Sequence, residues 1–173
     1  ATSVMVPRLL RYMARKAPAR EMVNIVMNLP AEAPAGRVAG VRMARDADVP
    51  VLARWRRLYR EERGIAFDAD VEALVRSQRV FVYEFEGTVV AAAKLDIELA
   101  TLVEIGGVYT FAPYRKQGFG CQIVQDLATR IRELGKTPVL QVDRQNTSAL
   151  HLYEQLGWQA KGPLARVWLT KTP

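Results

Sequence analysis

The chain has 173 residues, of which half are apolar and 25% are charged. This length and composition fit one globular domain with a sizeable core and exclude a disordered or low-complexity chain. No apolar run approaches the roughly 18 residues that a membrane-spanning helix needs. The single cysteine excludes an internal disulfide and favours a reducing compartment, and the single histidine excludes a multi-histidine metal site. We therefore expect a cytoplasmic protein without a metal ion.

The formal net charge of +7 is unevenly distributed along the chain. Residues 1–40 hold six basic and two acidic side chains, a net of +4, whereas residues 41–173 hold 19 basic and 16 acidic ones, a net of +3. The larger part of the chain is only mildly basic, which favours a small anionic ligand over a broad nucleic-acid surface. We expect neither a nucleic-acid partner nor a membrane partner.

The first 40 residues differ in pattern from the rest. Pro7 predicts the start of a helix that reaches about Lys16, and a second helix over 20–29 is expected to end before Pro30. We expect residues 1–37 to form a basic helical appendage and linker, followed by the domain over 38–173. The arginine-rich start also fits a transit peptide, a membrane-surface helix, a remnant of a preceding half-domain or an arm of a homodimer, and the pattern leaves these alternatives open.

From residue 38 onward the sequence alternates between short strands and helices. Strands are predicted over 38–44, 79–85, 88–95, 102–111, 138–142 and 167–170, with a tight hairpin at Glu86-Gly87. Helices are predicted after the candidate caps Asp46 or Asp48 and Asp68 or Asp70, and over 118–134 and 148–156. This order predicts an α/β fold (α+β by some schemes), with a mixed sheet and helices on its faces.

The most informative segment is residues 104–120, EIGGVYTFAPYRKQGFG, in which a strand feeds a loop that opens a helix. Backbone N–H groups at a helix start have no helical partner and carry the positive end of the dipole. Gly118 and Gly120 lack a Cβ, so a phosphate can approach the backbone, and Arg115 and Lys116 add positive charge. The segment matches neither a dinucleotide-binding fingerprint nor a Walker loop. By itself it predicts either an anion site or a tight turn whose glycines serve packing.

Two motifs together resemble the GNAT superfamily of acyl-CoA-dependent N-acyltransferases. Arg115, Gly118 and Gly120 match the pyrophosphate-binding pattern [RQ]-x-x-G-x-[GA], and Asn146 precedes ALHLYEQLGW, which is similar to the second motif, a helix bearing Y-E-x-L-G-[FW]. The resemblance covers residues 38–170 and is strongest over 104–158. It implies a mixed, mostly antiparallel central sheet with splayed central strands flanked by helices. It also implies acetyl-CoA (coenzyme A) as co-substrate.

The resemblance further implies which residues surround this co-substrate. The strand before the loop would pair with the amide-rich pantetheine arm like an added strand. The loop amides would cradle the pyrophosphate, and the second motif would flank the arm. The expected cofactor-binding residues are Val108, Tyr109, Thr110, Arg115, Lys116, Gln117, Gly118, Phe119, Gly120, Cys121, Asn146, Ala149 and Tyr153. The position of Cys121 near a helix N-terminus predicts a depressed thiol pKa. Cys121 is either a small residue that permits close backbone approach or a covalent acyl carrier.

Glu104 and Tyr153 are the candidate catalytic residues. Glu104 lies four residues before Val108 on one strand, which predicts that both face the same side. In the family a glutamate fourteen residues before the first motif glycine acts as general base, directly or through water, and Glu104 has that spacing to Gly118. The alternative is an exposed or substrate-ordering glutamate. Tyr153 would protonate the departing thiolate, and its alternative role is that of a core aromatic. The backbone N–H of Val108 is the expected oxyanion donor.

We therefore expect an N-acetyltransferase that moves an acetyl (acyl) group to a primary amine of a small molecule or amino-acid-like acceptor, by direct attack in a ternary complex. One alternative is acetylation of a protein N-terminus or lysine, because residues 141–158 resemble the ribosomal-protein acetylating branch. Another is a non-catalytic acyl-CoA-binding module. The sequence pattern does not specify the acceptor or the acyl chain length.

Overall fold

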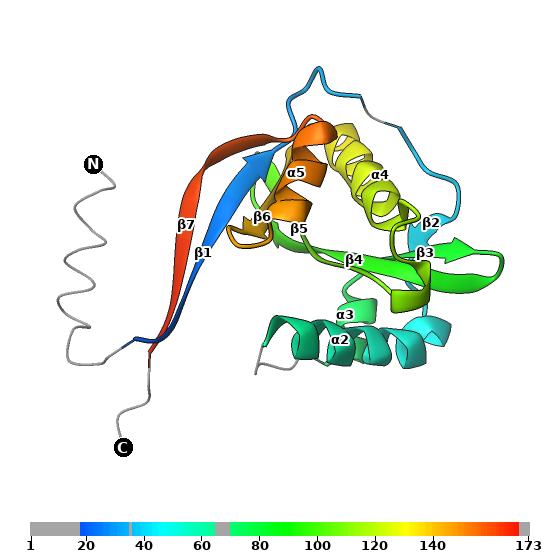
Figure 1. Cartoon of the computed structure of the whole chain (residues 1–173). Coiled ribbons are helices and arrows are strands. Elements are labelled where there is room, and N and C mark those ends of the chain that lie inside the picture. Colours follow the sequence, from blue (N-terminus) through cyan, green and yellow to red (C-terminus); the bar gives the residue numbers. More distant parts are fainter. Residues whose placement is uncertain (1–17, 35, 65–69, 170–173) are drawn as a thin grey trace.

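The computed structural model describes residues 18–34, 36–64 and 70–169 (Figure 1). The helix expected over 7–16 lies outside these residues. One seven-stranded sheet has the order β2-β3-β4-β5-β6-β1-β7, and every neighbouring pair is antiparallel except β5 and β6. The strands are β1 (Pro18–Asn28), β2 (Val41–Met43), β3 (Val80–Phe85), β4 (Thr88–Glu98), β5 (Leu102–Thr110), β6 (Thr137–Asp143) and β7 (Gln159–Leu169).

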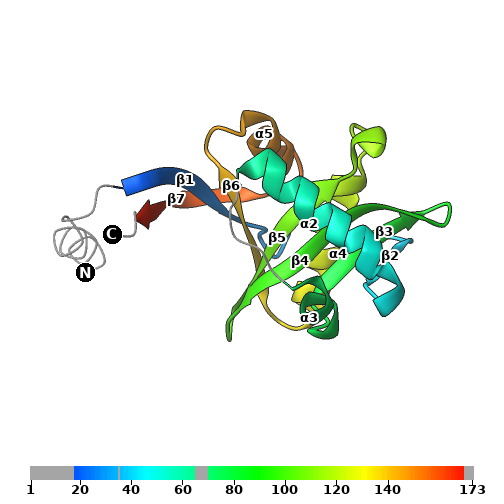
Figure 2. The same cartoon turned by 90° about the horizontal axis from the view of Figure 1, so that it is seen from below.

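Helices cover both faces of the sheet, as predicted. The helices are α2 (Val49–Arg63), α3 (Val71–Arg76), α4 (Phe119–Glu133) and α5 (Thr147–Gln155), with short 3-10 turns η1 (Asp46–Asp48) and η2 (Ala112–Tyr114). Helix α2 crosses the sheet in front of β4 and β5, with α3 beside it (Figure 2). Asp70 caps α3 as expected, because its side chain accepts a hydrogen bond from the N–H of Ala73.

The core has two clusters, one on each face of the sheet. The apolar stripe predicted for α4 supplies the fully buried Ile123, Leu127 and Ile131 to the first cluster. The second cluster lies under α2 and α3 and includes Leu52 and Trp55. Strand β4 contributes to both clusters: Ala91 and Ala93 belong to the first and Ala92 to the second, since successive side chains of a regular strand point to opposite faces.

Strand β1 overturns the prediction of a helix over 20–29. It pairs with β6 from Asn24 to Asn28 and with β7 along its whole length. Beyond the pairing with β6, the two strands continue as a two-stranded ribbon that projects from the body (Figure 1). Residues 18–28 thus belong to the main sheet and are not part of a helical appendage. The flanking prolines are compatible with either a helix or a strand. The segment forms a strand because it fills the position between β6 and β7 and pairs with both.

Strand β7 is also longer than predicted. It begins at Gln159 instead of residue 167, and it includes Gly162 and Pro163, which favour a loop when the sequence is considered alone. Its pairing with β1 shows an irregularity between Val26 and Met27, opposite this segment. Pairing with β1 therefore continues through residues that break local strand propensity.

Strand β5 contains the irregularity that shapes the site. Its parallel pairing with β6 runs only from Leu102 to Ile105, and the two strands splay beyond that point, as the family resemblance implies. In its pairing with β4, Gly106 is opposite Lys94 and Tyr109 is opposite Ala92. Between these two pairs β5 advances by three residues and β4 by two, so β5 carries one extra residue, a β-bulge. Gly107 has φ +61 within this bulge. A side chain is strained at such a φ, so glycine suits the position.

Candidate active site

The glycine-rich loop leads directly into the N-terminus of α4. Gly118 occupies the N-cap position with φ +84, a conformation that other residues rarely adopt. A Cβ added to Gly120 would lie 3.1 Å from Oγ1 of Thr110, so a side chain there would crowd the end of β5. The first N–H groups of α4 lack helical acceptors, and they face no bulky side chain at these two positions. This is the anion-site geometry that the sequence predicted.

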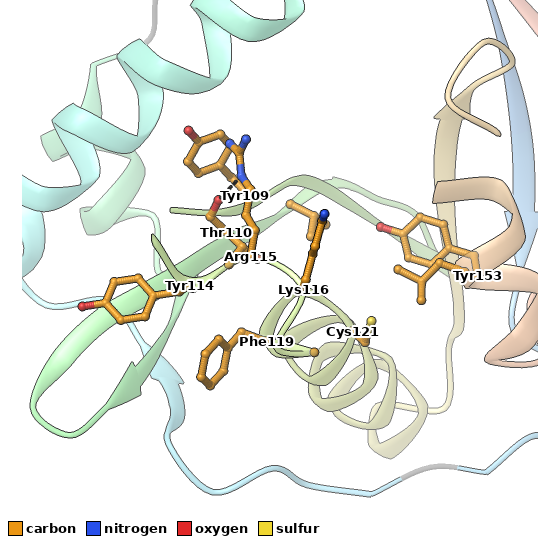
Figure 3. Close-up of a pocket in the computed structure, with 12 residues that line it drawn as sticks. Tyr109, Thr110, Tyr114, Arg115, Lys116, Phe119, Cys121 and Tyr153 are labelled. Carbon is orange, nitrogen blue, oxygen red and sulfur yellow. Dashed lines mark hydrogen bonds between the residues drawn. The ribbon is translucent and has the colours of Figure 1, made fainter. Parts of the chain in front are cut away.

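A cavity of about 370 Å³ opens between this loop, the end of β5 and helix α5 (Figure 3). Its lining comprises Val108, Tyr109, Thr110, Tyr114, Arg115, Lys116, Gly118, Phe119, Gly120, Cys121, Leu152 and Tyr153. Ten of these were predicted from the sequence. Tyr114 and Leu152 were missed, although each directly precedes a residue that was chosen.

Three of the predicted cofactor-binding residues do not line the cavity. The side chain of Gln117 donates to the carbonyl of Pro113. Asn146 caps α5, since its Oδ1 accepts from the N–H of Ala149 at 3.2 Å and from the hydroxyl of Ser148 at 3.0 Å. The structure thus places Asn146 and Ala149 in a helix cap, and their role toward a cofactor stays a prediction.

The guanidinium of Arg115 binds the end of α2. Its Nη2 lies 2.7 and 2.9 Å from the two carboxylate oxygens of Glu62, and its Nε donates to the carbonyl of Thr110. The guanidinium also lies over the Tyr109 ring, as Figure 3 shows, and the Tyr109 hydroxyl donates to Glu62 at 2.9 Å. Hydrogen bonding to Glu62 raises the pKa of Arg115. Partial burial opposes ionisation of Glu62, but the bonds from Arg115 and Tyr109 lower its pKa on balance. Sequence reasoning missed Glu62, because nothing near it in the chain indicates this contact.

Tyr153 projects from α5, and its hydroxyl points into the cavity (Figure 3). Its ring packs edge-on against Trp158. Burial raises the pKa of Tyr153 to about 12, so the hydroxyl keeps its proton at neutral pH. The group is therefore a proton donor that lies within the cavity.

The thiol of Cys121 also faces this cavity, but its predicted pKa shift is wrong in direction. Burial raises the pKa of Cys121, because the loss of solvent disfavours the thiolate more than the helix N-terminus favours it. This makes a covalent acyl carrier less suitable and leaves the small-residue interpretation.

Glu104 is buried, with 6% of its surface exposed, on the face of the sheet covered by α2. The Nε2 of Gln141 donates to its Oε2 at 3.1 Å. Burial and the nearby carboxylate of Asp96 raise the pKa of Glu104. A buried carboxylate with a raised pKa is suited to accept a proton near neutral pH.

The expectation that Glu104 and Val108 share a face is wrong. Val108 packs against the cluster under α4, whereas Tyr109 belongs to the cluster under α2. The extra residue in the Gly106–Gly107 bulge inverts the alternation, and the indole N–H of Trp55 holds the bulge by donating to the carbonyl of Gly107 at 3.1 Å. Glu104 and Tyr153 thus lie on opposite faces of β5, at the point where its pairing with β6 ends.

The comparisons with known proteins agree with this geometry. A model of the FR47-like protein family matches residues 85–169, which include the loop and α5. A putative GNAT-family acetyltransferase from Novosphingobium aromaticivorans superposes with a TM-score of 0.75 at 20% identity, over 91% of this chain and 68% of that chain. The chain has the GNAT fold.

Other solved structures place this GNAT fold among proteins of different lengths. A GNAT-family acetyltransferase from Colwellia psychrerythraea matches with a TM-score of 0.69 at 12% identity, over 93% of this chain and 62% of that chain. A ribosomal-protein-alanine N-acetyltransferase from Brucella melitensis matches with a TM-score of 0.58 at 19% identity, over 74% of this chain and 99% of that chain. The chain spans 58–68% of the length of the first three solved structures that it matches. No curated protein matches it.

Two further findings concern the described part of this GNAT fold. Of the side chains that the structure describes, no group of three or more from histidine, cysteine, aspartate or glutamate could hold a metal ion. Within residues 18–34, 36–64 and 70–169, no helix combines the length and apolar character that a membrane crossing requires.

Proposed function

We propose that the protein transfers an acetyl (acyl) group from a coenzyme A thioester to a primary amine of a small molecule, by direct attack in a ternary complex. One observation carries the proposal. The open N-terminus of α4, with Gly118 and Gly120, forms one end of a cavity whose other side holds the Tyr153 hydroxyl. A loop suited to bind phosphate and a hydroxyl suited to donate a proton thus line one cavity of about 370 Å³.

The loop is suited to hold the pyrophosphate of coenzyme A. Its backbone amides and the side chain of Lys116 would meet the phosphate charge, as helix N-termini do for other anions. Residues 106–110 of β5 have no partner in β6, so their backbone groups can pair with the amides of a pantetheine arm. Arg115 would take part either from its present position on Glu62 or by exchanging Glu62 for a phosphate.

The bound thioester supplies an activated acyl group. The residues of this chain would carry out two proton transfers, one from the amine and one to the leaving thiolate. The amine must lose a proton before its lone pair attacks, and Glu104 is the buried carboxylate available to accept it, directly or through water. The thiolate that leaves must gain a proton, which Tyr153 can donate. The backbone N–H of Val108, beside the cavity, is the candidate donor to the developing oxyanion.

The experiment is to incubate the protein with acetyl-CoA and a panel of primary amines and of peptides with free N-termini. Release of the free thiol and the mass of the acylated product are both measured, and calorimetry measures coenzyme A binding. We expect binding and transfer to at least one small amine. Binding without transfer to any acceptor would support the non-catalytic module, and transfer only to peptides would support protein acetylation. Absence of binding would contradict the whole proposal.

A further inference from the structure

Polar side chains from several strands meet beside Glu104 on the α2 face of the sheet. The side-chain amide of Gln141 is at their centre. Its Nε2 donates to Glu104 Oε2 at 3.1 Å, while its Oε1 accepts from Asn24 Nδ2 at 3.2 Å and from Arg166 Nη2 at 2.8 Å. A carboxylate only accepts and a guanidinium only donates, so these bonds determine which amide atom faces which neighbour. One amide therefore holds the Glu104 carboxylate at one end and the Arg166 guanidinium at the other.

The guanidinium of Arg166 has N–H donors available for a ligand. It is exposed on β7, and its hydrogen bond to Gln141 uses one of the five N–H donors of a guanidinium. Among the side chains that the structure describes, no carboxylate lies within salt-bridge distance of it. A guanidinium with free donors in a planar fork is suited to bind a carboxylate from a ligand.

A second arginine in this region is buried without an acidic partner. Arg56 is 6% exposed on the buried face of α2, and its Nε has no hydrogen-bond partner. Its guanidinium lies over the Trp55 ring, and no acid in the described part of the chain pairs with it. An unpaired buried charge is costly, and an anion nearby relieves that cost. Burial raises the pKa of Tyr59, one turn further along α2, and the charges of Arg63, Arg56 and Arg166 oppose that rise.

Of the two carboxylates in this region, Asp96 and Glu104, Glu104 is the one available to bind a cationic group of a ligand. Asp96 already has a cationic partner, because it forms an ion pair with Lys94. It lies directly over Gly106, because a Cβ on that glycine would collide with the Asp96 carboxylate. Glu104 has no cationic side chain at salt-bridge distance among the described residues. One carboxylate and two guanidiniums therefore lack oppositely charged partners.

The spacing between these groups suits one kind of ligand. Because both hydrogen bonds end on the amide of Gln141, the Glu104 oxygen and the Arg166 nitrogen lie at most about 8 Å apart. An α-amino acid that hydrogen-bonds through its amine at one end and its carboxylate at the other bridges up to about 9 Å, and shorter distances when those bonds bend, so it fits within this limit. We propose that the acceptor is an α-amino acid whose free carboxylate binds Arg166 while its amine faces Glu104.

This inference rests on the proposed function and narrows its acceptor. A protein N-terminus carries a peptide amide where an amino acid carries its carboxylate, and a lysine side chain has its amine far from any backbone acid. Both would leave Arg166 without a partner. Gln141 acts as a positioning residue, because its amide aligns the base and the carboxylate-binding guanidinium together.

The test compares the twenty α-amino acids with their C-terminal amides as acceptors for acetyl-CoA, in the wild-type protein and in three variants. Arg166→Met removes the guanidinium, and Arg166→Lys keeps the charge without the planar fork. Arg57→Met is the matched control, because Arg57 is exposed on α2 and pairs with Glu61. Thermal unfolding verifies that each variant is folded.

We expect the wild-type protein to acetylate acids and not the matching amides. In Arg166→Met, kcat/KM for the preferred acid should fall about 10- to 100-fold, mainly through KM, because a hydrogen-bonded charge partner is lost. Arg166→Lys should recover part of that loss, and Arg57→Met should match the wild type. Equal use of acids and amides by the wild type would overturn the inference and leave the proposed acyl transfer intact. An equal loss for both series in Arg166→Met would also overturn it. Turnover of neither series by the wild type would overturn this inference, while acetylation of another small amine in the panel would leave the proposed function intact.

Discussion

The two ends of the candidate active site are built in different ways. The proposed cofactor end consists of the loop and first turn of α4, a contiguous stretch in which backbone amides, left accessible by two glycines, face the cavity. The proposed acceptor end is assembled from Asn24, Glu104, Gln141 and Arg166, which lie on four different strands. A site built from contiguous backbone can be recognised by a local sequence motif. A site made from side chains on strands that are distant in the chain has no such motif.

The largest effect is expected at the acceptor end from Glu104→Gln. Removing the base should lower kcat/KM by about 10²- to 10⁴-fold. The loss should be largest at low pH, where the amine is protonated, and should shrink as the free amine accumulates at higher pH. A pH–rate profile of the variant measures this, and a profile of wild-type shape would remove Glu104 from the mechanism.

Tyr153→Phe tests the proton donor at the cofactor end. We expect kcat to fall about 10²-fold, because the thiolate then leaves without its donor. The affinity for coenzyme A should stay close to that of the wild type, since the ring and its packing on Trp158 remain. Steady-state kinetics together with calorimetry separate the two quantities. A change in kcat within twofold would make Tyr153 a packing residue.

Gly118→Val tests whether backbone access is what the cofactor end supplies. Valine is strained at φ +84 and brings a branched side chain to the loop, so affinity for coenzyme A should fall about tenfold or more. The matched control is Gly87→Val, which carries the same substitution at φ +72 in the β3–β4 hairpin, where nothing lies within 4 Å. Calorimetry measures both. An equal effect in the two variants would indicate loss of fold instead of loss of access.

The smallest effect concerns stability and again contrasts the two ends. Burial and Asp96 raise the pKa of Glu104 in the folded protein above its usual value of 4.5. The folded state then holds this proton more tightly than the unfolded chain. That contribution to stability is complete below the unfolded pKa and is lost as the pH rises through the folded pKa.

At pH 8 the charged Glu104 should therefore cost stability, and Glu104→Gln should raise the free energy of unfolding by about 1 kcal/mol. At pH 4 the gain should nearly vanish, because the wild-type carboxyl is then protonated. Urea unfolding at both pH values measures the difference. Tyr153→Phe serves as the control, because its hydroxyl stays protonated at both values and should show no such pH dependence. A gain for Glu104→Gln that is equal at both pH values would contradict the raised pKa.

Local pattern predicted much of the fold and the cofactor end. The β3–β4 hairpin, the α4 stripe, the Asp70 cap and the glycine loop all follow from neighbouring residues, and each appears in the structure. The failures share one cause. Residues 20–29 become a strand because β6 and β7 leave a position between them, and β7 extends over Gly162 and Pro163 because β1 pairs with it. Pairing over long sequence separations overrides local propensity.

The sequence by itself determined the sheet-and-helix order from residue 38 and the glycine-rich loop that opens α4, and it proposed the two candidate catalytic residues, because short-range spacing carries that information. Only the tertiary structure decided on which faces Glu104 and Val108 lie, because one extra residue in the Gly106–Gly107 bulge inverts the alternation of β5. It alone brought Glu62 to Arg115, and Asn24 and Arg166 to Gln141. Such contacts depend on which strands become neighbours in the folded sheet.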